Sequence, residues 1–214
     1  MNRHDLVYVS PVAWQALIRA RAEFPADPIV QAWVDRGWPL VSRRSDAGEP
    51  PGVPLGLPLP PSAGKKRLSF LMRHEDVVAA LPAPSVASAA RAAPALWEPT
   101  LLRLGRLASH NGAEARVFGS LALQFVTGLQ YLTDRSDLDF ALHVSRDTPL
   151  RALAKVIADL EVDAPMRLDG EFIRGGSAVN WRELHAGARE VLVKTPAGVS
   201  LLDADEFISG RLPT

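Results

Sequence analysis

Apolar and polar positions alternate most clearly in the second half of the chain, where they predict short strands and amphipathic helices. In the run from residue 137 to 144, Leu138, Phe140, Leu142 and Val144 occupy one face of a strand. Helical spacing of apolar residues marks residues 97–107, 120–129 and 150–160. We expect further strands at 115–118, 166–173, 178–181, 191–194 and 199–202.

The first third of the chain has a weaker pattern because a proline-rich stretch at residues 50–61 interrupts it. Proline lacks a backbone N–H and disfavours helix interiors and central strands. We therefore expect an extended loop there, with short strands at 38–41 and 68–72 on either side and a helix at 14–22. Residues 81–95, rich in alanine and proline, are expected to connect two units or to hold a helix between 85 and 93.

The combined pattern predicts an α+β fold with two domains. We assign residues 1–85 to a smaller N-terminal domain and residues 86–214 to a domain in which a mixed sheet is flanked by helices. Three of the five tryptophans fall in the first of these domains.

Composition narrows the functional classes. The 214 residues carry 24 basic and 24 acidic side chains, and this balance argues against a long nucleic-acid track. The absence of cysteine excludes disulfides, thiolate metal sites and a cysteine nucleophile. Residues 1–9 lack the long apolar stretch of a signal peptide, and no window approaches the roughly 18 apolar residues of a membrane span. We therefore expect a cytoplasmic protein without a membrane or nucleic-acid partner.

Gly119 and Ser120 lie at an expected step from strand to helix. A helix N-terminus exposes unpaired N–H groups and favours an anion. Gly119 would let a phosphate approach the backbone closely, and Ser120 would add a hydroxyl donor. Serine is also a frequent helix N-cap, so an ordinary cap is the competing interpretation.

Asp137 and Asp139 lie on one face of the expected strand at 137–144. Carboxylates held this close repel each other unless a cation lies between them. Magnesium commonly uses one or two carboxylates together with substrate phosphates, so the pair predicts a Mg²⁺ site. An exposed strand with a solvated acidic face is the competing interpretation.

The order of strand, Gly119-Ser120, helix, turn and Asp137-Leu138-Asp139 resembles the nucleotidyltransferase superfamily of DNA polymerase β type. The resemblance implies that Gly119 and Ser120 hold phosphates, that Asp137 and Asp139 bind the metal, and that a neighbouring strand supplies a third carboxylate. Asp169 and Glu171 are the candidates, and the choice between them stays open. The spacer from residue 121 to 136 is longer than is common in that superfamily.

Further motifs extend over nearly the whole chain. They are Arg3-His4-Asp5-Leu6-Val7, Trp38-Pro39-Leu40-Val41, Gly56-Leu57-Pro58-Leu59-Pro60, Val117-Phe118-Gly119-Ser120-Leu121-Ala122 with Gln124, Thr127-Gly128-Leu129, Tyr131-Leu132, Ser136-Asp137-Leu138-Asp139, Val179-Asn180-Trp181-Arg182-Glu183-Leu184 and Val191-Leu192-Val193-Lys194. In these motifs the chain resembles the phosphoribosyl-dephospho-CoA transferases of malonate decarboxylase, also called its holo-acyl-carrier-protein synthases. This narrower family would account for the long spacer.

The resemblance implies an enzyme that transfers the prosthetic group of 2′-(5″-triphosphoribosyl)-3′-dephospho-CoA to a serine of the acyl carrier protein subunit, releasing pyrophosphate. The partners would be that donor and that carrier protein. Basic side chains are expected to hold donor phosphates or an acidic carrier, although solvated surface positions are the alternative. The candidates are Arg43, Arg44, Lys65, Lys66, Arg67 and Lys194.

Two other functions remain open. The chain could be another nucleotidyltransferase acting on a small molecule or a protein, including the citrate lyase counterpart. The tryptophan-rich first third favours the malonate system. It could also be a catalytically silent module that binds a nucleotide or the carrier protein, and failure to bind Mg²⁺ with the donor would favour that interpretation.

Overall fold

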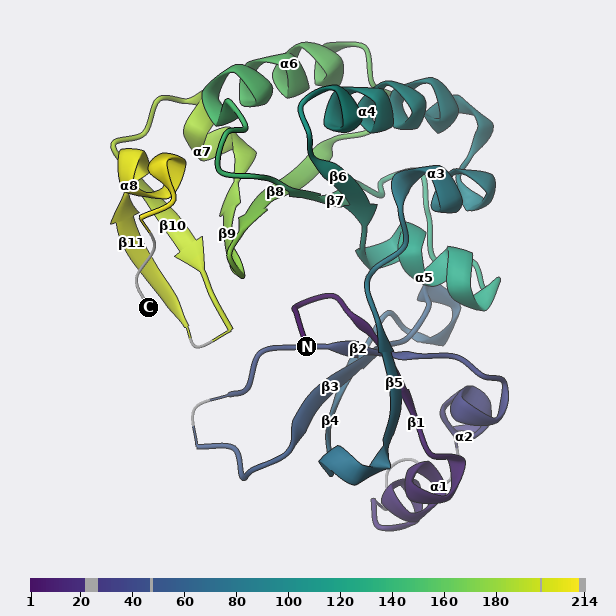
Figure 1. Ribbon diagram of the computed structural model, residues 1–214. Coiled ribbons are helices and arrows are strands. Elements are labelled where there is room, and N and C mark those ends of the chain that lie inside the picture. Colours follow the sequence, from purple (N-terminus) through teal and green to yellow (C-terminus); the bar gives the residue numbers. More distant parts are fainter. Residues whose placement is uncertain (22–26, 47, 197, 212–214) are drawn as a thin grey trace. The chain divides into compact units, whose positions relative to one another are not determined.

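The computed structural model describes residues 1–21, 27–46, 48–196 and 198–211. The chain divides into two units, Met1–Ala83 and Pro84–Thr214, each of which contains its own sheet and helices (Figure 1). The expected mixture of α and β structure is confirmed. No helix in the described ranges has the length and apolar character needed to cross a membrane.

The N-terminal unit is built on a five-stranded antiparallel sheet in the order β4-β3-β2-β1-β5. Trp14 and Trp33 are fully buried in its core, and their indole N–H groups donate to the carbonyls of Val30 and Pro39 at 3.1 and 3.0 Å. The elements are β1 Leu6–Val9, α1 Pro11–Arg19, α2 Pro28–Asp35, β2 Leu40–Ser42, β3 Val53–Pro58, η1 Pro61–Ala63, β4 Arg67–Met72, η2 His74–Asp76 and β5 Val77–Leu81.

The prediction of an extended loop at residues 50–61 is wrong for the central part of this stretch. There β3 forms an interior strand between β4 and β2. The N–H of Leu59 donates toward β4, to the Lys66 carbonyl, at 2.7 Å. Backbone direction alternates along a strand, so Pro54 and Pro58 turn toward β2, which has only three residues. The two prolines therefore lack N–H groups only on the side of β2, where few backbone hydrogen bonds form because β2 is short. On the other side, β3 pairs with β4 along its whole length.

Helix α2 has a capping signal that the hydrophobic pattern does not reveal. Asp27 accepts a hydrogen bond from the N–H of Ile29 at 3.1 Å, and Pro28 occupies the first turn. Helix α1 begins in the same way at Ser10 and Pro11, and Ala22, the expected end of this helix, lies outside the described residues. The pattern also missed β1, β5, α7 and α8.

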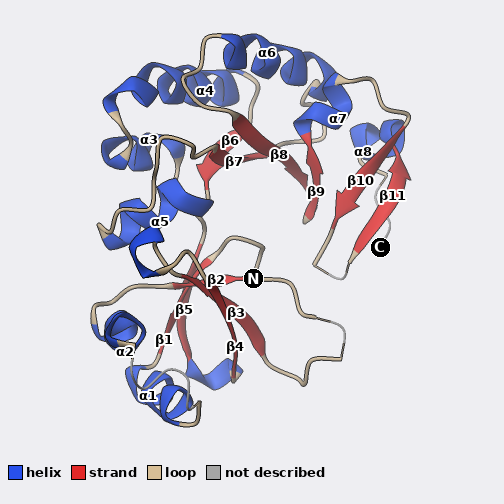
Figure 2. Cartoon of the chain, turned by 180° about the vertical axis from the view of Figure 1, so that it is seen from behind, coloured by secondary structure: helices blue, strands red, loops and turns tan. Residues whose placement is uncertain are grey.

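The C-terminal unit is built on a six-stranded sheet in the order β11-β10-β9-β8-β7-β6 (Figure 2). Strands β7 and β8 are parallel and the other neighbours are antiparallel. The elements are α3 Val86–Ala89, η3 Ala90–Ala92, η4 Ala95–Trp97, α4 Glu98–His110, β6 Glu114–Val117, α5 Gly119–Thr127, β7 Leu138–His143, α6 Leu150–Val162, β8 Leu168–Arg174, β9 Ser177–Asn180, α7 Trp181–His185, β10 Glu190–Lys194, β11 Val199–Asp203 and α8 Ala204–Ser209.

One face of this sheet packs against helices and forms the core. Leu138, Phe140 and Phe172 are fully buried among core residues of α4 and α6 (Figure 1). A Cβ on Gly170 would lie 2.1 Å from the Phe140 ring, so only glycine fits opposite this side chain. Because side chains alternate along a strand, Asp139 and the residues on its side project from the opposite face.

Candidate active site

The turn from β6 to α5 brings Gly119 against the Asp139 side chain. Gly119 has a φ of +60°, and a Cβ there would lie 2.0 Å from an Asp139 carboxylate oxygen. The N–H of Phe118 donates to the Asp139 carbonyl at 3.1 Å and fixes the turn on β7. The chain therefore needs glycine at this position both for backbone conformation and for space.

Ser120 is not the N-cap of α5, because the helix already includes Gly119 and its cap position is Phe118. No side chain caps the helix. The backbone N–H of Ser120 donates a hydrogen bond to the Asp139 carboxylate. This arrangement contradicts the ordinary-cap interpretation. The Asp139 carboxylate occupies one N–H group of the first turn of α5, so an anion bound there would use the remaining N–H groups.

Three carboxylates gather where β7 and β8 begin. Asp169 lies directly beside Asp139 in the parallel register, and Asp137 immediately precedes β7. Burial, followed by the charges of Asp169 and Asp137, raises the pKa of Asp139 to about 7. Asp137 is 38% exposed and lies 3.6 Å from the Arg167 guanidinium. The solvated-face interpretation of the Asp pair is thus not supported for Asp139.

Glu171 lies two residues further along β8, beside Ala141, and is 5% exposed. The Lys194 ammonium on β10 donates to its carboxylate at 2.7 Å. Lys194 therefore reaches the carboxylate face of the sheet, where its observed partner is the Glu171 side chain and not a phosphate. This ion pair makes Glu171 less available than Asp169 as a further ligand beside Asp139.

Asn180 holds the Asp169 carboxylate from the end of β9. Its side-chain amide donates to Asp169 Oδ1 at 3.1 Å, while its own Oδ1 accepts the N–H of Arg182 at 3.0 Å. The second bond makes Asn180 the N-cap of α7. The sequence pattern predicted a strand at 178–181 and no helix after it. The signal that could have found this role is an asparagine followed three residues later by Glu183, which is typical of a helix N-terminus.

The donor set fits a hard divalent cation. Magnesium prefers oxygen ligands, and crowding by Asp137 and Asp169 disfavours the charged form of Asp139 unless a cation compensates. Among the described side chains, no three His, Cys, Asp or Glu are already arranged around one metal position. Asp137 and Asp139 are the residues that could hold such an ion, and magnesium commonly combines one or two carboxylates with substrate phosphates.

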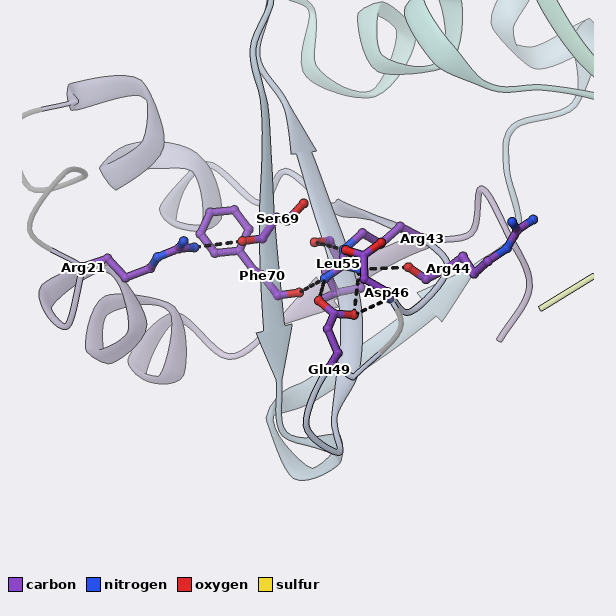
Figure 3. Close-up of polar contacts among 8 residues, drawn as sticks. All are labelled: Arg21, Arg43, Arg44, Asp46, Glu49, Leu55, Ser69 and Phe70. Carbon is purple, nitrogen blue, oxygen red and sulfur yellow. Dashed lines mark hydrogen bonds and ion pairs between the residues drawn. The ribbon is translucent and has the colours of Figure 1, made fainter. Parts of the chain in front are cut away.

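In the N-terminal unit, Arg43 is occupied by structural contacts (Figure 3). Its guanidinium pairs with both carboxylate oxygens of Glu49, one at 2.9 Å, and donates to the carbonyls of Arg44 and Leu55 at 2.8 and 3.3 Å. The hydrogen bond to Arg43 lowers the pKa of Glu49. These contacts favour a role in joining the loop after β2 to the sheet over the expected role in phosphate binding.

The other predicted basic residues of this unit are more accessible. The Arg44 side chain points away from the Arg43–Glu49 pair (Figure 3). Lys65, Lys66 and Arg67 are exposed, and none forms an ion pair with a described residue. They follow Gly64 at the turn between β3 and β4. Their positions permit binding to a phosphate or an acidic protein surface.

Comparison with known proteins covers both units. Residues 2–83 match the phosphoribosyl-dephospho-CoA transferase MdcG N-terminal domain, and residues 85–205 match the corresponding C-terminal domain. A protein of Bradyrhizobium diazoefficiens called phosphoribosyl-dephospho-CoA transferase is 48% identical over 210 residues, which cover 98% of this chain and 93% of the relative.

Proteins of the same name are more distant in two other bacteria. One from Xanthomonas campestris is 38% identical, covering 87% of this chain and 92% of its own length. One from Pseudomonas putida is 27% identical, covering 93% and 92%. No solved structure matches the chain. The two domain matches and the full-length relatives show that this chain belongs to the MdcG family of phosphoribosyl-dephospho-CoA transferases.

Proposed function

We propose that the protein transfers the prosthetic group of 2′-(5″-triphosphoribosyl)-3′-dephospho-CoA to a serine of the malonate decarboxylase acyl carrier protein. The observation that carries this proposal is the packing of Gly119, at the start of α5, against Asp139. It brings a helix start, where a phosphate could bind, next to a cluster of carboxylates. The family match identifies the class of donor.

In the proposed reaction, the serine oxygen bonds to the α-phosphorus of the donor and the bond from that phosphorus to the pyrophosphate oxygen breaks. A magnesium ion held by Asp137 and Asp139 would neutralise charge on the phosphates. The first turn of α5 would orient the triphosphate through the Ser120 hydroxyl and the N–H groups that Asp139 does not occupy. The reaction needs positioning more than a protein nucleophile, which agrees with the absence of cysteine.

Asp169 is the carboxylate that we propose to accept the serine proton and to complete the site. It adjoins Asp139 in the register and Asn180 orients it, whereas Glu171 is engaged by Lys194. Lys194 would then act on the donor only indirectly, by compensating the negative charge of Glu171 on this face of the sheet.

The N-terminal unit would recognise the carrier protein or the dephospho-CoA end of the donor. The exposed cluster of Lys65, Lys66 and Arg67 supports this role because it offers three cations with no bound partner among the described residues. The absence of cysteine favours a reducing compartment, and we place the reaction in the cytoplasm.

The proposal is tested by intact-protein mass spectrometry. Purified protein, Mg²⁺, the triphosphoribosyl donor and the apo carrier subunit are mixed, and the carrier should gain one phosphoribosyl-dephospho-CoA group. The gain should require Mg²⁺ and should vanish when the acceptor serine of the carrier is replaced by alanine. If wild-type protein leaves unmodified a carrier that a family relative does modify, the malonate decarboxylase assignment fails.

We expect Asn180→Ser to separate two roles of this residue. Serine is a good N-cap, so α7 and the thermal stability should be retained to within about 0.5 kcal/mol. The loss of the amide donor should lower the transfer rate about tenfold and weaken metal binding, because Asp169 is no longer oriented. Isothermal titration with Mn²⁺ gives the second readout independently of turnover.

Asn180→Ala is the matched comparison. It removes both the cap and the donor, and should cost about 1 kcal/mol of stability in addition to the catalytic defect. Wild-type transfer and Mn²⁺ affinity in Asn180→Ser would show that the hydrogen bond to Asp169 has no part in the site.

A further inference from the structure

A cavity of about 490 Å³ lies in the C-terminal unit, between the segment before α4 and the loop that connects α5 to β7. Its size is typical of small-molecule sites. Trp97 and Leu132, which are 6% and 3% exposed, contribute apolar walls. Gln130, Asp134 and Ser136 contribute polar groups. The cavity thus combines apolar surface with a few hydrogen-bonding groups, as ligand pockets do.

Two of the residues that line the cavity connect it to the region of the carboxylate cluster. Ser136, one of its lining residues, immediately precedes Asp137. Pro165 lines it too, and also lines the shallow surface around Arg167, whose guanidinium lies 3.6 Å from Asp137. A ligand with its phosphates beside Asp137 could therefore extend toward this space.

Hydrogen bonds hold the walls of the cavity in place. The Gln124 side chain donates to the Ala92 carbonyl at 2.7 Å and accepts the N–H groups of Tyr131 and Leu132, both at 3.0 Å. It thereby joins the segment before α4 to the loop after α5. The Gln130 amide donates to the Leu132 carbonyl at 2.8 Å. A site organised in advance loses less conformational freedom when a ligand binds.

These walls account for a sequence feature that the phosphate chemistry does not use. The long spacer between Gly119-Ser120 and Asp137 carries Gln124 and the residues around Tyr131. Neither is needed to hold phosphate or metal, but together they build the cavity. The spacer therefore supplies about half of the residues that line the cavity.

We propose that the cavity receives the adenine nucleoside of the donor, an inference that rests on the proposed function. In that donor the triphosphate-bearing ribose is attached directly to the adenosine, whereas the thiol of the pantetheine arm lies at the far end. The part of the donor nearest the phosphates is therefore the nucleoside. Trp97 and Leu132 provide apolar surface for the base, and Asp134 can accept hydrogen bonds from the exocyclic amine or ribose hydroxyls.

The test is isothermal titration of the full chain with dephospho-CoA, without divalent cations, followed by competition with AMP and, separately, with pantetheine. AMP should displace dephospho-CoA and pantetheine should not. Ala93→Trp, which fills the cavity, should raise the Kd about tenfold. Leu96→Ala should raise it about threefold, and because Leu96 is 78% exposed this variant should fold normally.

Leu102→Ala is the matched control, since this leucine is also exposed but lines a different cavity, and its Kd should equal that of wild type. Three results would overturn the inference: no binding of dephospho-CoA to wild type, displacement by pantetheine alone, or an unchanged Kd in both Ala93→Trp and Leu96→Ala.

Failure of this inference can be told apart from failure of the proposed function. If no transfer to the carrier occurs but AMP still competes and Ala93→Trp still weakens binding, the pocket stands and the proposed acceptor or donor is wrong. If wild type transfers the group and Ala93→Trp keeps the wild-type KM for the donor, the pocket assignment is wrong and the function stands.

Discussion

Replacement of Asp139 or Asp137 by asparagine is expected to lower the rate of prosthetic-group transfer by about a thousandfold or more. Asparagine keeps the size of the side chain and removes the charge that would hold Mg²⁺ against the donor phosphates. Charge neutralisation and positioning supply most of the rate enhancement in phosphoryl transfer, so its loss has few substitutes within the site.

The measurement is single-turnover transfer to the carrier subunit at saturating donor, followed by intact mass. A defect in kcat with little change in donor KM is expected if the pair acts mainly on the transition state. Asp159→Asn is the matched control, because this carboxylate is exposed on α6, which packs against the sheet face opposite Asp139, and the variant should transfer at the wild-type rate. Activity within tenfold of wild type in both site variants would remove the pair from the metal site.

The order of strands and helices around the site was predictable from the sequence, because it depends on the spacing of apolar residues that are close together in the chain. Every strand and helix expected between residues 97 and 202 is present, with ends within three residues of the expected positions. The alternation along β7 correctly separates the buried Leu138 and Phe140 from Asp139. Likewise, a glycine between a strand and an apolar helix correctly marked the turn that meets Asp139.

The contacts that select among side chains were not predictable in this way, since they depend on register. Asp169 and Glu171 share a strand face and look equivalent in the sequence. Only the pairing of β7 with β8 places Asp169 beside Asp139, and only the position of β10 places Lys194 on Glu171. The structural role of Arg43 could likewise not be predicted from the sequence, because its partner Glu49 lies across a loop.

The N-terminal sheet illustrates a different limit. Proline content argued against a strand at residues 53–58, yet β3 is interior to the sheet. Proline lacks the N–H group that pairs with a neighbouring strand, but whether this disrupts the sheet depends on which neighbour each proline faces. Pro54 and Pro58 share one edge of β3, and the neighbour on that edge is only three residues long. Two prolines four residues apart lie on the same edge of a strand, so the spacing of Pro54 and Pro58 could have indicated that a strand is possible here.

Asp139→Asn should also make the metal-free protein more stable at neutral pH, although it removes activity. Burial and the nearby charges of Asp169 and Asp137 raise the pKa of Asp139 to about 7, against an ordinary value of 3.8. The folded protein therefore holds this proton more tightly than the unfolded chain does. Ionisation of Asp139 at neutral pH costs folding free energy, which asparagine avoids.

The pH dependence of this difference follows from proton linkage. Below about pH 4 the carboxyl is protonated in both states, so it contributes no ionisation penalty. Between pH 4 and 7 the folded state binds more protons than the unfolded state, so the free energy of unfolding of wild type falls as pH rises. One pKa unit corresponds to about 1.4 kcal/mol, and with partial solvent screening we expect an advantage of about 2–3 kcal/mol for Asp139→Asn at pH 8.

Thermal unfolding in EDTA at pH 4.5, 6 and 8 measures this advantage, with Asp159→Asn as the control. The gap between Asp139→Asn and wild type should widen with pH and level off above pH 7. Mg²⁺ with inorganic pyrophosphate should then stabilise wild type and leave Asp139→Asn nearly unchanged, because a ligand stabilises only the state that binds it. A pH-independent gap, or a variant less stable than wild type at pH 8, would show that Asp139 is not held under electrostatic strain. In that case the carboxylates would lack the uncompensated charge that makes this site suited to a cation.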